Sequence, residues 1–102
     1  VASEDGGFTL RILGLVSILA SVQWYEFEAQ PASCLISESH GTGSIESISL
    51  LKGALEIEIE ENREVVEAGE TLRYGTETAH KLTNIGKGVC HGFMVNLLSP
   101  TL

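Results

Sequence analysis

Residues 54–60 read Ala-Leu-Glu-Ile-Glu-Ile-Glu, and this strict alternation limits the possible folds more than any other segment. Successive side chains of a β-strand point to opposite faces of the sheet, so Leu55, Ile57 and Ile59 would share one face and the glutamates the other. A helix would scatter the same residues around its circumference. We therefore predict a strand that buries one face against a core and leaves the other in water.

Several other short segments alternate in the same way or are rich in β-branched and aromatic residues. Only Lys52-Gly53 separates the segment before residue 54 from the alternating strand, so we predict that the two form a hairpin. Residues 61–63 predict the next turn. Residues 12–20 are compatible with a helical turn, and the sequence leaves this open. The expected strands are residues 8–13, 22–28, 45–51, 54–60, 71–74, 80–85 and 89–98.

The number and spacing of these strands predict the fold class. Short strands recur about every ten residues with turn-forming residues between them, and no segment requires a helix of more than a turn or two. The chain has 102 residues, which is the size of one domain. We therefore predict a single all-β domain, an antiparallel sandwich or barrel.

Charge and composition exclude some classes of function. Six Lys plus Arg stand against fourteen Asp plus Glu, giving a formal net charge of −8, which argues against nucleic-acid binding by this segment itself. The longest apolar run, residues 12–22, is about half as long as a membrane span and follows no basic region, so we expect neither a membrane segment nor a signal peptide. Cys34 and Cys90 lack a Cys-x-x-Cys spacing. We expect both to be buried, reduced thiols in the cytoplasm, although one disulfide remains an alternative.

Three residues with metal-binding side chains stand at predicted strand ends. His40 lies in a loop before a strand, Glu46 near the start of that strand, and His80 at the start of a later one. If the strands close into a barrel, these side chains can meet at one mouth, where two imidazoles and a carboxylate would leave open positions on a divalent metal. On spacing alone, the simpler interpretation is that these three residues are polar groups of loops and strands and bind no metal.

Two stretches around these residues follow a known pattern. Residues 40–53 run His-Gly-Thr-Gly-Ser-Ile-Glu, then six residues, then Gly. Residues 69–84 begin with Gly and carry His80 and Asn84 in a fixed spacing. In order and spacing, the two stretches resemble the two motifs of the cupin family. The resemblance implies a cupin-type antiparallel β-barrel, a double-stranded β-helix of the jelly-roll kind.

Three positions depart from the cupin motifs. Thr42 stands where a second His is expected, Gly75 where a Pro is expected, and Glu77 where a second Gly is expected. The four-ligand metal site of the family is therefore incomplete. The resemblance then implies either no cofactor or a weakly bound divalent metal on the two histidines and the glutamate named above.

With Leu72-Arg73-Tyr74 in the second motif, the pattern is similar to a narrower group, the C-terminal cupin sensor domains of bacterial helix-turn-helix (XRE-type) transcriptional regulators. This resemblance implies that residues 1–102 are one cupin domain that forms a homodimer and binds a small-molecule effector, such as a polyamine or an amino-acid derivative. Val1 as the first residue agrees with a domain that lacks its N-terminal helix-turn-helix domain, through which alone DNA would be contacted. The expected ligand-binding residues of the barrel interior are His40, Glu46, Tyr74 and His80.

A sensor domain of this kind would not be an enzyme. The sequence leaves two other interpretations open. One is a stand-alone cupin enzyme that uses a metal for dioxygenase or isomerase chemistry, and the other is a dimerisation module whose barrel is packed shut. Trp24, Tyr25 and Phe27 are expected in the core or in a dimer contact. His91 is expected as a packed or surface residue and not as a ligand.

Overall fold

A computed structural model describes residues 6–13 and 22–98, and every regular element within them is a β-strand. These residues contain no helix, and hence none long and apolar enough to cross a membrane. Of the segment 12–20, which is compatible with a helical turn in sequence, residues 12 and 13 belong to a strand and residues 14–20 lie outside the described residues. The strands are β1 (Phe8–Leu13), β2 (Val22–Ala29), β3 (Cys34–Ser37), β4 (Ile45–Lys52), β5 (Ala54–Ile59), β6 (Asn62–Glu67), β7 (Thr71–Gly75), β8 (His80–Asn84) and β9 (Cys90–Leu97).

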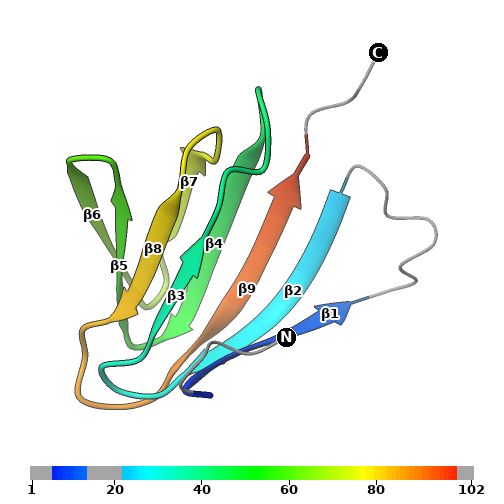
Figure 1. The fold of residues 1–102 in the computed structure, drawn as a ribbon. Helices are drawn as coiled ribbons and strands as arrows, with labels where there is room; N and C mark the ends of the chain where they lie inside the picture. Colours follow the sequence, from blue (N-terminus) through cyan, green and yellow to red (C-terminus); the bar gives the residue numbers. More distant parts are fainter. Residues whose placement is uncertain (1–5, 14–21, 99–102) are drawn as a thin grey trace.

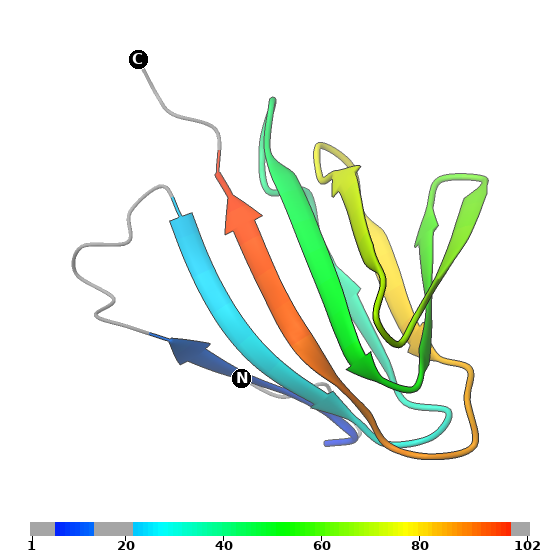
Figure 2. The same cartoon turned by 180° about the vertical axis from the view of Figure 1, so that it is seen from behind.

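The strands form two antiparallel sheets that face each other as two layers (Figure 1 and, from behind, Figure 2). One sheet has the order β1-β2-β9-β4-β7, and the other has the order β3-β8-β5-β6. Consecutive strands often lie in different sheets, which is the crossing pattern of a jelly roll. The predicted all-β antiparallel fold is therefore confirmed.

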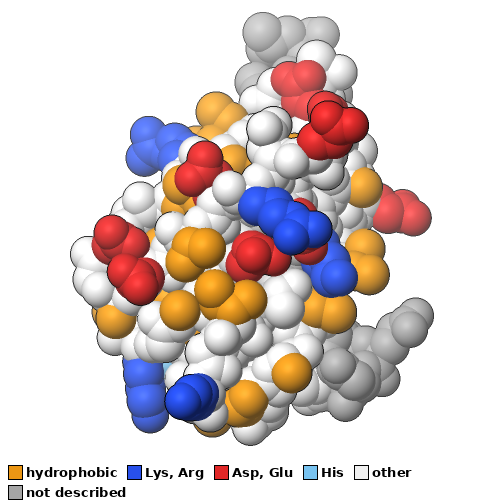
Figure 3. Space-filling model, turned by 90° about the vertical axis from the view of Figure 1, so that its left-hand side faces the viewer, with side chains coloured by type: hydrophobic (Ala, Val, Ile, Leu, Met, Phe, Trp, Pro, Cys, Tyr) orange, Lys and Arg blue, Asp and Glu red, His pale blue; other side chains and the backbone are white. Residues whose placement is uncertain are grey.

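Strand β5 keeps the alternation seen in the sequence. Leu55 and Ile57 are fully buried between the sheets, whereas Glu56 and Glu58 stay partly exposed on the outer face. On that face a carboxylate oxygen of Glu58 lies 3.0 Å from Nε of Arg63 on β6. The side of the molecule shown in Figure 3 likewise has acidic and basic side chains interspersed with hydrophobic ones.

The predicted hairpin across Lys52-Gly53 is wrong. β4 pairs with β7 and β9, whereas β5 pairs with β6 and β8 in the opposite sheet. Gly53 has a φ of 96°, and a Cβ built on it would lie 2.8 Å from the Sγ atom of Cys90. The chain therefore crosses between the layers here, against the thiol, because both strands have an apolar face to bury in the same core.

Two smaller predictions also need correction. The turn expected at residues 61–63 is one residue earlier, because Ile59 pairs directly with Asn62 and the connection is Glu60-Glu61, with Glu60 at a φ of 54°. Strands β3 and β6 were not predicted. The four residues of β3 offer too short a pattern to separate from a loop, and β6 begins within the segment expected to be a turn.

The core fills the space between the two sheets. Phe8 of β1 and Phe27 of β2 stack with their ring centroids 5.5 Å apart, and both are buried. Asn84 closes one end of the core, because its amide nitrogen donates to the carbonyls of Ala29 and Gly88 and its amide oxygen accepts from the nitrogen of Gly86. The buried apolar residues are Phe8, Phe27, Ala29, Ile48, Leu50, Leu55, Ile57, Val66, Leu82, Cys90 and Met94.

At the opposite end of the five-stranded sheet, the inward-facing residues become polar. Residues directly paired on antiparallel strands point to the same face, so the register divides this sheet into rows across the strands. One row joins Tyr25, Met94, Ile48 and Leu72, all packed in or against the core. The next inward row, two residues along each strand, joins Gln23, Asn96, Glu46 and Tyr74. This polar row is where the candidate site lies.

Candidate functional site

Glu46 is a buried carboxyl group on the inner face of β4. The alternation of the strand places Glu46, Ile48 and Leu50 inward, and Glu46 is 2% exposed. Its Oε2 atom accepts a hydrogen bond from the hydroxyl of Tyr74, the residue directly opposite on β7. Burial raises the pKa of Glu46 from 4.5 to about 8. None of the six Lys and Arg residues is buried, so none neutralises this carboxyl group from within the core.

His80 is the first residue of β8 and reaches the same region from the other sheet. It is 3% exposed, and its Nδ1 atom lies 3.2 Å from the carbonyl oxygen of Thr78. A carbonyl can only accept, so Nδ1 carries the proton and, in the neutral ring, Nε2 is left with a free lone pair. Nε2 lies 3.8 Å from Oε2 of Glu46, too far for a hydrogen bond, and has no hydrogen-bond partner in the described part of the chain.

His40 comes from the loop between β3 and β4, and backbone contacts hold that loop in place. Its backbone nitrogen donates to the carbonyl of Thr76 at 2.8 Å, and the nitrogen of Thr76 donates to the carbonyl of Ser44 at 2.9 Å. The side chain of Glu77 accepts from the backbone nitrogen of Gly43 at 2.8 Å. Glu77, a departure from the second motif, therefore ties the two motif loops together.

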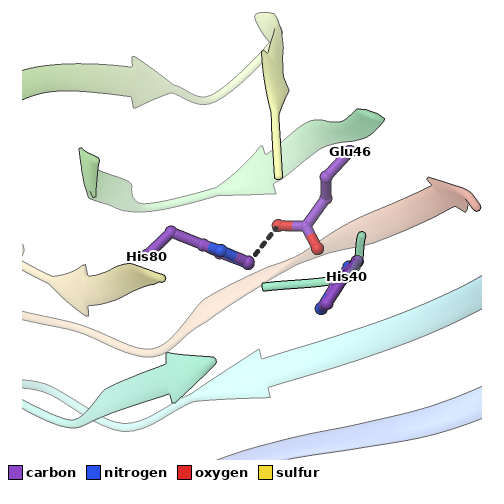
Figure 4. A group of neighbouring side chains, drawn as sticks. All are labelled: His40, Glu46 and His80. Atoms are coloured by element: carbon purple, nitrogen blue, oxygen red, sulfur yellow. Dashed lines mark ion pairs between the residues drawn. The ribbon is translucent and has the colours of Figure 1, made fainter. Parts of the chain in front are cut away.

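The three side chains meet as the sequence analysis expected. One ligand atom from each of His40, Glu46 and His80 can be chosen so that all lie within 4.8 Å of one another. Figure 4 shows the His80 ring and the Glu46 carboxyl group pointing toward each other, with His40 beside them. The two imidazole rings meet edge to face, with centroids 5.1 Å apart. Burial, and secondarily the neighbouring His80, lowers the pKa of His40 and favours its neutral form.

The ligand atoms of His40, Glu46 and His80 are of the types that bind a divalent metal ion, and their separations are slightly larger than one ion requires. Nδ1 of His40 and Nε2 of His80 are buried and have no hydrogen-bond partner among the described residues, so both nitrogens can act as ligands. Two atoms that each lie about 2.1 Å from one ion are at most about 4.2 Å apart, so the most separated pair would have to approach by several tenths of an ångström. Metal binding would also displace the proton that burial favours on Glu46.

No protein-family model matches this sequence, and no curated protein matches it. Solved structures do match. The Cupin_2 domain of an XRE family transcriptional regulator from Enterobacter cloacae superposes with a TM-score of 0.81 at 18% identity, covering 93% of this chain and 99% of that one. Its length and fold correspond to the present chain almost from end to end. The chain has a cupin fold.

Other proteins with the cupin fold are similar at the same level of sequence identity. An HTH_3 family transcriptional regulator from Vibrio cholerae gives a TM-score of 0.80 at 18% identity, covering 96% of this chain and 54% of that one. The present chain thus spans about half the length of that regulator. A sugar phosphate isomerase of the cupin superfamily from Silicibacter pomeroyi gives 0.70 at 16% identity, covering 92% and 61%. Cupin domains of regulators and of enzymes are both among the matches.

Within this cupin fold, two polar residues of the interior were missed by the sequence analysis. Asn96 on β9 is 6% exposed with an unpartnered Oδ1 atom, and Thr76 is fully buried with an unpartnered hydroxyl, in each case among the described residues. The alternation Cys90, Gly92, Met94, Asn96 would have placed Asn96 on the inner face. Thr76 lies in a loop and offers no such pattern.

The remaining predicted residues fall outside the cluster. Phe27 is in the core and Tyr25 packs against it, whereas Trp24 is 53% exposed on the outer face. His91 also lies outside, as expected, with Nε2 at 2.7 Å from a carboxylate oxygen of Glu26. The two cysteines are free thiols. Cys90 on β9 is buried as expected, but Cys34 on β3 is only partly buried.

Proposed function

We propose that this cupin domain is the effector-binding and dimerising part of a bacterial transcriptional regulator. The observation that carries the proposal is the incomplete ligand set. His40, Glu46 and His80 gather in the interior, but position 42 is Thr in place of the second His of the motif. A site of this kind keeps polar anchors for a small molecule and lacks the full metal centre that cupin oxygenases and isomerases use. The two regulators among the similar structures support this choice.

In this proposal the effector contacts the polar end of the interior. His40, Glu46, Tyr74 and His80 supply lone pairs and one hydroxyl, and the row beyond them is apolar. Binding sites for small molecules combine an apolar wall with a few convergent polar groups in this way. The absence of buried Lys or Arg favours an effector that offers hydrogen-bond donors or positive charge, as an amine does.

The proposed signal is a shift between two arrangements of a dimer. An effector moves such an equilibrium only by its difference in affinity for the two arrangements. The dimer contact is assigned to the outer face of the five-stranded sheet, where Trp24 and Phe93 are exposed side chains on neighbouring strands. DNA would be bound by an N-terminal helix-turn-helix domain of the same polypeptide, and both cysteines would be reduced thiols in the cytoplasm.

The test is effector binding by the purified domain, followed through its thermal unfolding. A defined panel of polyamines and amino-acid derivatives is added one compound at a time, and a ligand that binds the folded state raises the melting temperature in a concentration-dependent way. We expect at least one compound to do so in the wild type and not in Glu46→Leu, while Glu64→Gln, exposed on β6, responds as the wild type does. A complete reading frame without a helix-turn-helix domain would contradict the proposal.

The second candidate is a metal-dependent cupin enzyme, favoured by the same three side chains and by the isomerase among the similar structures. In that case His40, Glu46 and His80 would hold the metal, which would polarise a substrate oxygen. Stoichiometric metal in the purified protein, together with turnover that is lost in His80→Ala, would place this candidate first.

A further inference from the structure

Asn96 is a residue of the inward polar row that the proposed function does not use. It is 6% exposed, and its Oδ1 atom has no hydrogen-bond partner in the described part of the chain. A buried amide oxygen without a partner has lost its hydration and gained nothing in exchange, so it destabilises the fold. Packing alone does not explain an Asn at this position, because Leu or Met would fill the same space without an unpartnered oxygen that destabilises the fold.

The register of the sheet places Asn96 beside Glu46, one of the three residues of the ligand cluster. Asn96 on β9 is the direct partner of Glu46 on β4, and both side chains are buried on the inner face. Directly opposed residues on antiparallel strands have Cβ atoms about 5 Å apart, within reach of a shared ligand. His80 Nε2, likewise without a partner, approaches Glu46 from the opposite sheet. Two buried atoms with unused lone pairs thus belong to residues that neighbour Glu46, Asn96 on the adjacent strand and His80 in the opposite sheet.

We propose that the side-chain oxygen of Asn96 is a fourth ligand of a divalent metal ion held by His40, Glu46 and His80. The first motif supplies no second His because position 42 is Thr, and Asn96 stands opposite Glu46 on a strand that neither motif includes. This inference goes beyond the proposed function, since it concerns the metal chemistry of the interior whether or not the domain senses a metabolite.

The chemistry of the four atoms defines which metal is bound. Two imidazoles and one carboxylate suit Fe²⁺ and Mn²⁺ as well as Zn²⁺, and an amide oxygen adds a hard donor, which favours Mn²⁺. Zn²⁺ is satisfied by three protein ligands and a water molecule. The loss of Asn96 should therefore weaken Mn²⁺ binding more than Zn²⁺ binding.

The experiment is calorimetric titration of the metal-free full chain with Mn²⁺ and, separately, with Zn²⁺. We expect Asn96→Leu to weaken Mn²⁺ binding at least about tenfold, the scale seen when groups around a metal are removed. The loss for Zn²⁺ should be smaller. Asn96→Asp keeps an oxygen at the site and should bind Mn²⁺ at least as tightly as the wild type. The control is Glu64→Gln, which alters an exposed side chain on β6 away from the site and should leave both affinities unchanged.

Thermal unfolding of the metal-free variants separates this role from a structural one. Asn96→Leu removes the unpartnered oxygen, so its melting temperature should equal or exceed that of the wild type. The proposal is overturned if Asn96→Leu binds Mn²⁺ as the wild type does, or if the wild type binds no Mn²⁺ at millimolar concentration. It is also overturned if Asn96→Leu lowers the melting temperature and Asn96→Asp fails to restore Mn²⁺ affinity.

Discussion

The hydroxyl of Tyr74 donates a hydrogen bond to the carboxyl group of Glu46, and the two residues are direct partners on β7 and β4. Both side chains face the interior, where Glu46 is 2% exposed and Tyr74 packs against the core. The pairing of the two strands thus fixes the position of the carboxyl group before any ligand arrives. A site built on opposed strand residues is better ordered than one built on loops.

The buried carboxyl group makes stability depend on pH. Because the pKa of Glu46 rises from 4.5 to about 8 on folding, the folded chain keeps a proton between these values that the unfolded chain releases. The free energy of unfolding should therefore fall as the pH rises from about 4.5 to 8, by up to roughly 1.4 kcal/mol per unit. Urea unfolding of the metal-free protein at several pH values across this range measures the slope.

Glu46→Gln provides the comparison, because the amide oxygen still accepts from Tyr74 and cannot ionise. We expect this variant to match the wild type near pH 4.5 and to exceed its stability by a few kcal/mol at pH 8. Glu64→Gln on the exposed face of β6 should keep the wild-type slope. A wild-type stability that stays level or rises between pH 5 and pH 8, relative to Glu46→Gln, would show that Glu46 is ionised in the fold.

Gly53 should not tolerate even the smallest side chain. A Cβ atom there would lie 2.8 Å from Sγ and 3.1 Å from Cα of Cys90, at a φ of 96°. We expect Gly53→Ala to lower the free energy of unfolding by about 2 to 4 kcal/mol, from backbone strain and crowding together. Gly69→Ala isolates the strain, since Gly69 has a φ of 88° and open space, and should cost about 1 kcal/mol. If the two variants lose the same free energy of unfolding, crowding against Cys90 does not contribute at Gly53.

The same glycine shows how far the sequence could predict the fold. Alternation identified β5 and most other strands, because the two-residue period is a local property. It could not say that Lys52-Gly53 leads to the other sheet, because a short connection is compatible with a hairpin or a crossing. The choice depends on contacts with Cys90, which lies far along the chain. Which of the two sheets a strand joins depends on tertiary contacts, and a single sequence gives little information about these contacts.

The metal content of the purified domain is the next prediction. With Thr42 in place of the second His, the only fourth ligand proposed is the amide oxygen of Asn96, which donates less strongly than an imidazole. The site should therefore hold a divalent ion weakly, and we expect less than one metal ion per chain after purification without an affinity tag. Elemental analysis of the wild type and of His80→Ala measures this, and whatever metal is present should be lost in the variant. A full equivalent of iron, manganese or zinc in the wild type would contradict the prediction.

Dimer formation can be tested on the domain alone. Trp24 is 53% exposed and Phe93 36% exposed on the outer face of the five-stranded sheet. We expect sedimentation at tens of micromolar to show a two-fold dimer, and Trp24→Glu to shift it to monomer. Ile36→Glu is the control, because Ile36 is 71% exposed on β3 of the other sheet, and it should leave the dimer intact. A wild type that sediments only as monomer would count against the assigned surface.

Sequence motifs predicted the three residues at the centre of the candidate site, but they did not predict the residues and contacts around these three. His40, Glu46 and His80 could be placed together because motif spacing fixes the register of the strands that carry them. Asn96 could not be found from motif spacing, because it lies outside both motifs on the last strand of the sheet. The link from Glu77 to Gly43 could not be predicted, since it joins two loops whose approach only the folded chain defines.

The place of β9 in the sheet order has a consequence for how the chain is made. β9 lies between β2 and β4, and its pairing with β2 joins Val22 to Leu97. The five-stranded sheet therefore cannot form until Leu97 has left the ribosome, and until then β2 and β4 each lack a neighbour on one side. Pairings this distant in sequence form slowly, in milliseconds to seconds, and leave strand edges open to association. A chain truncated before β9 should accordingly aggregate rather than persist as a smaller domain.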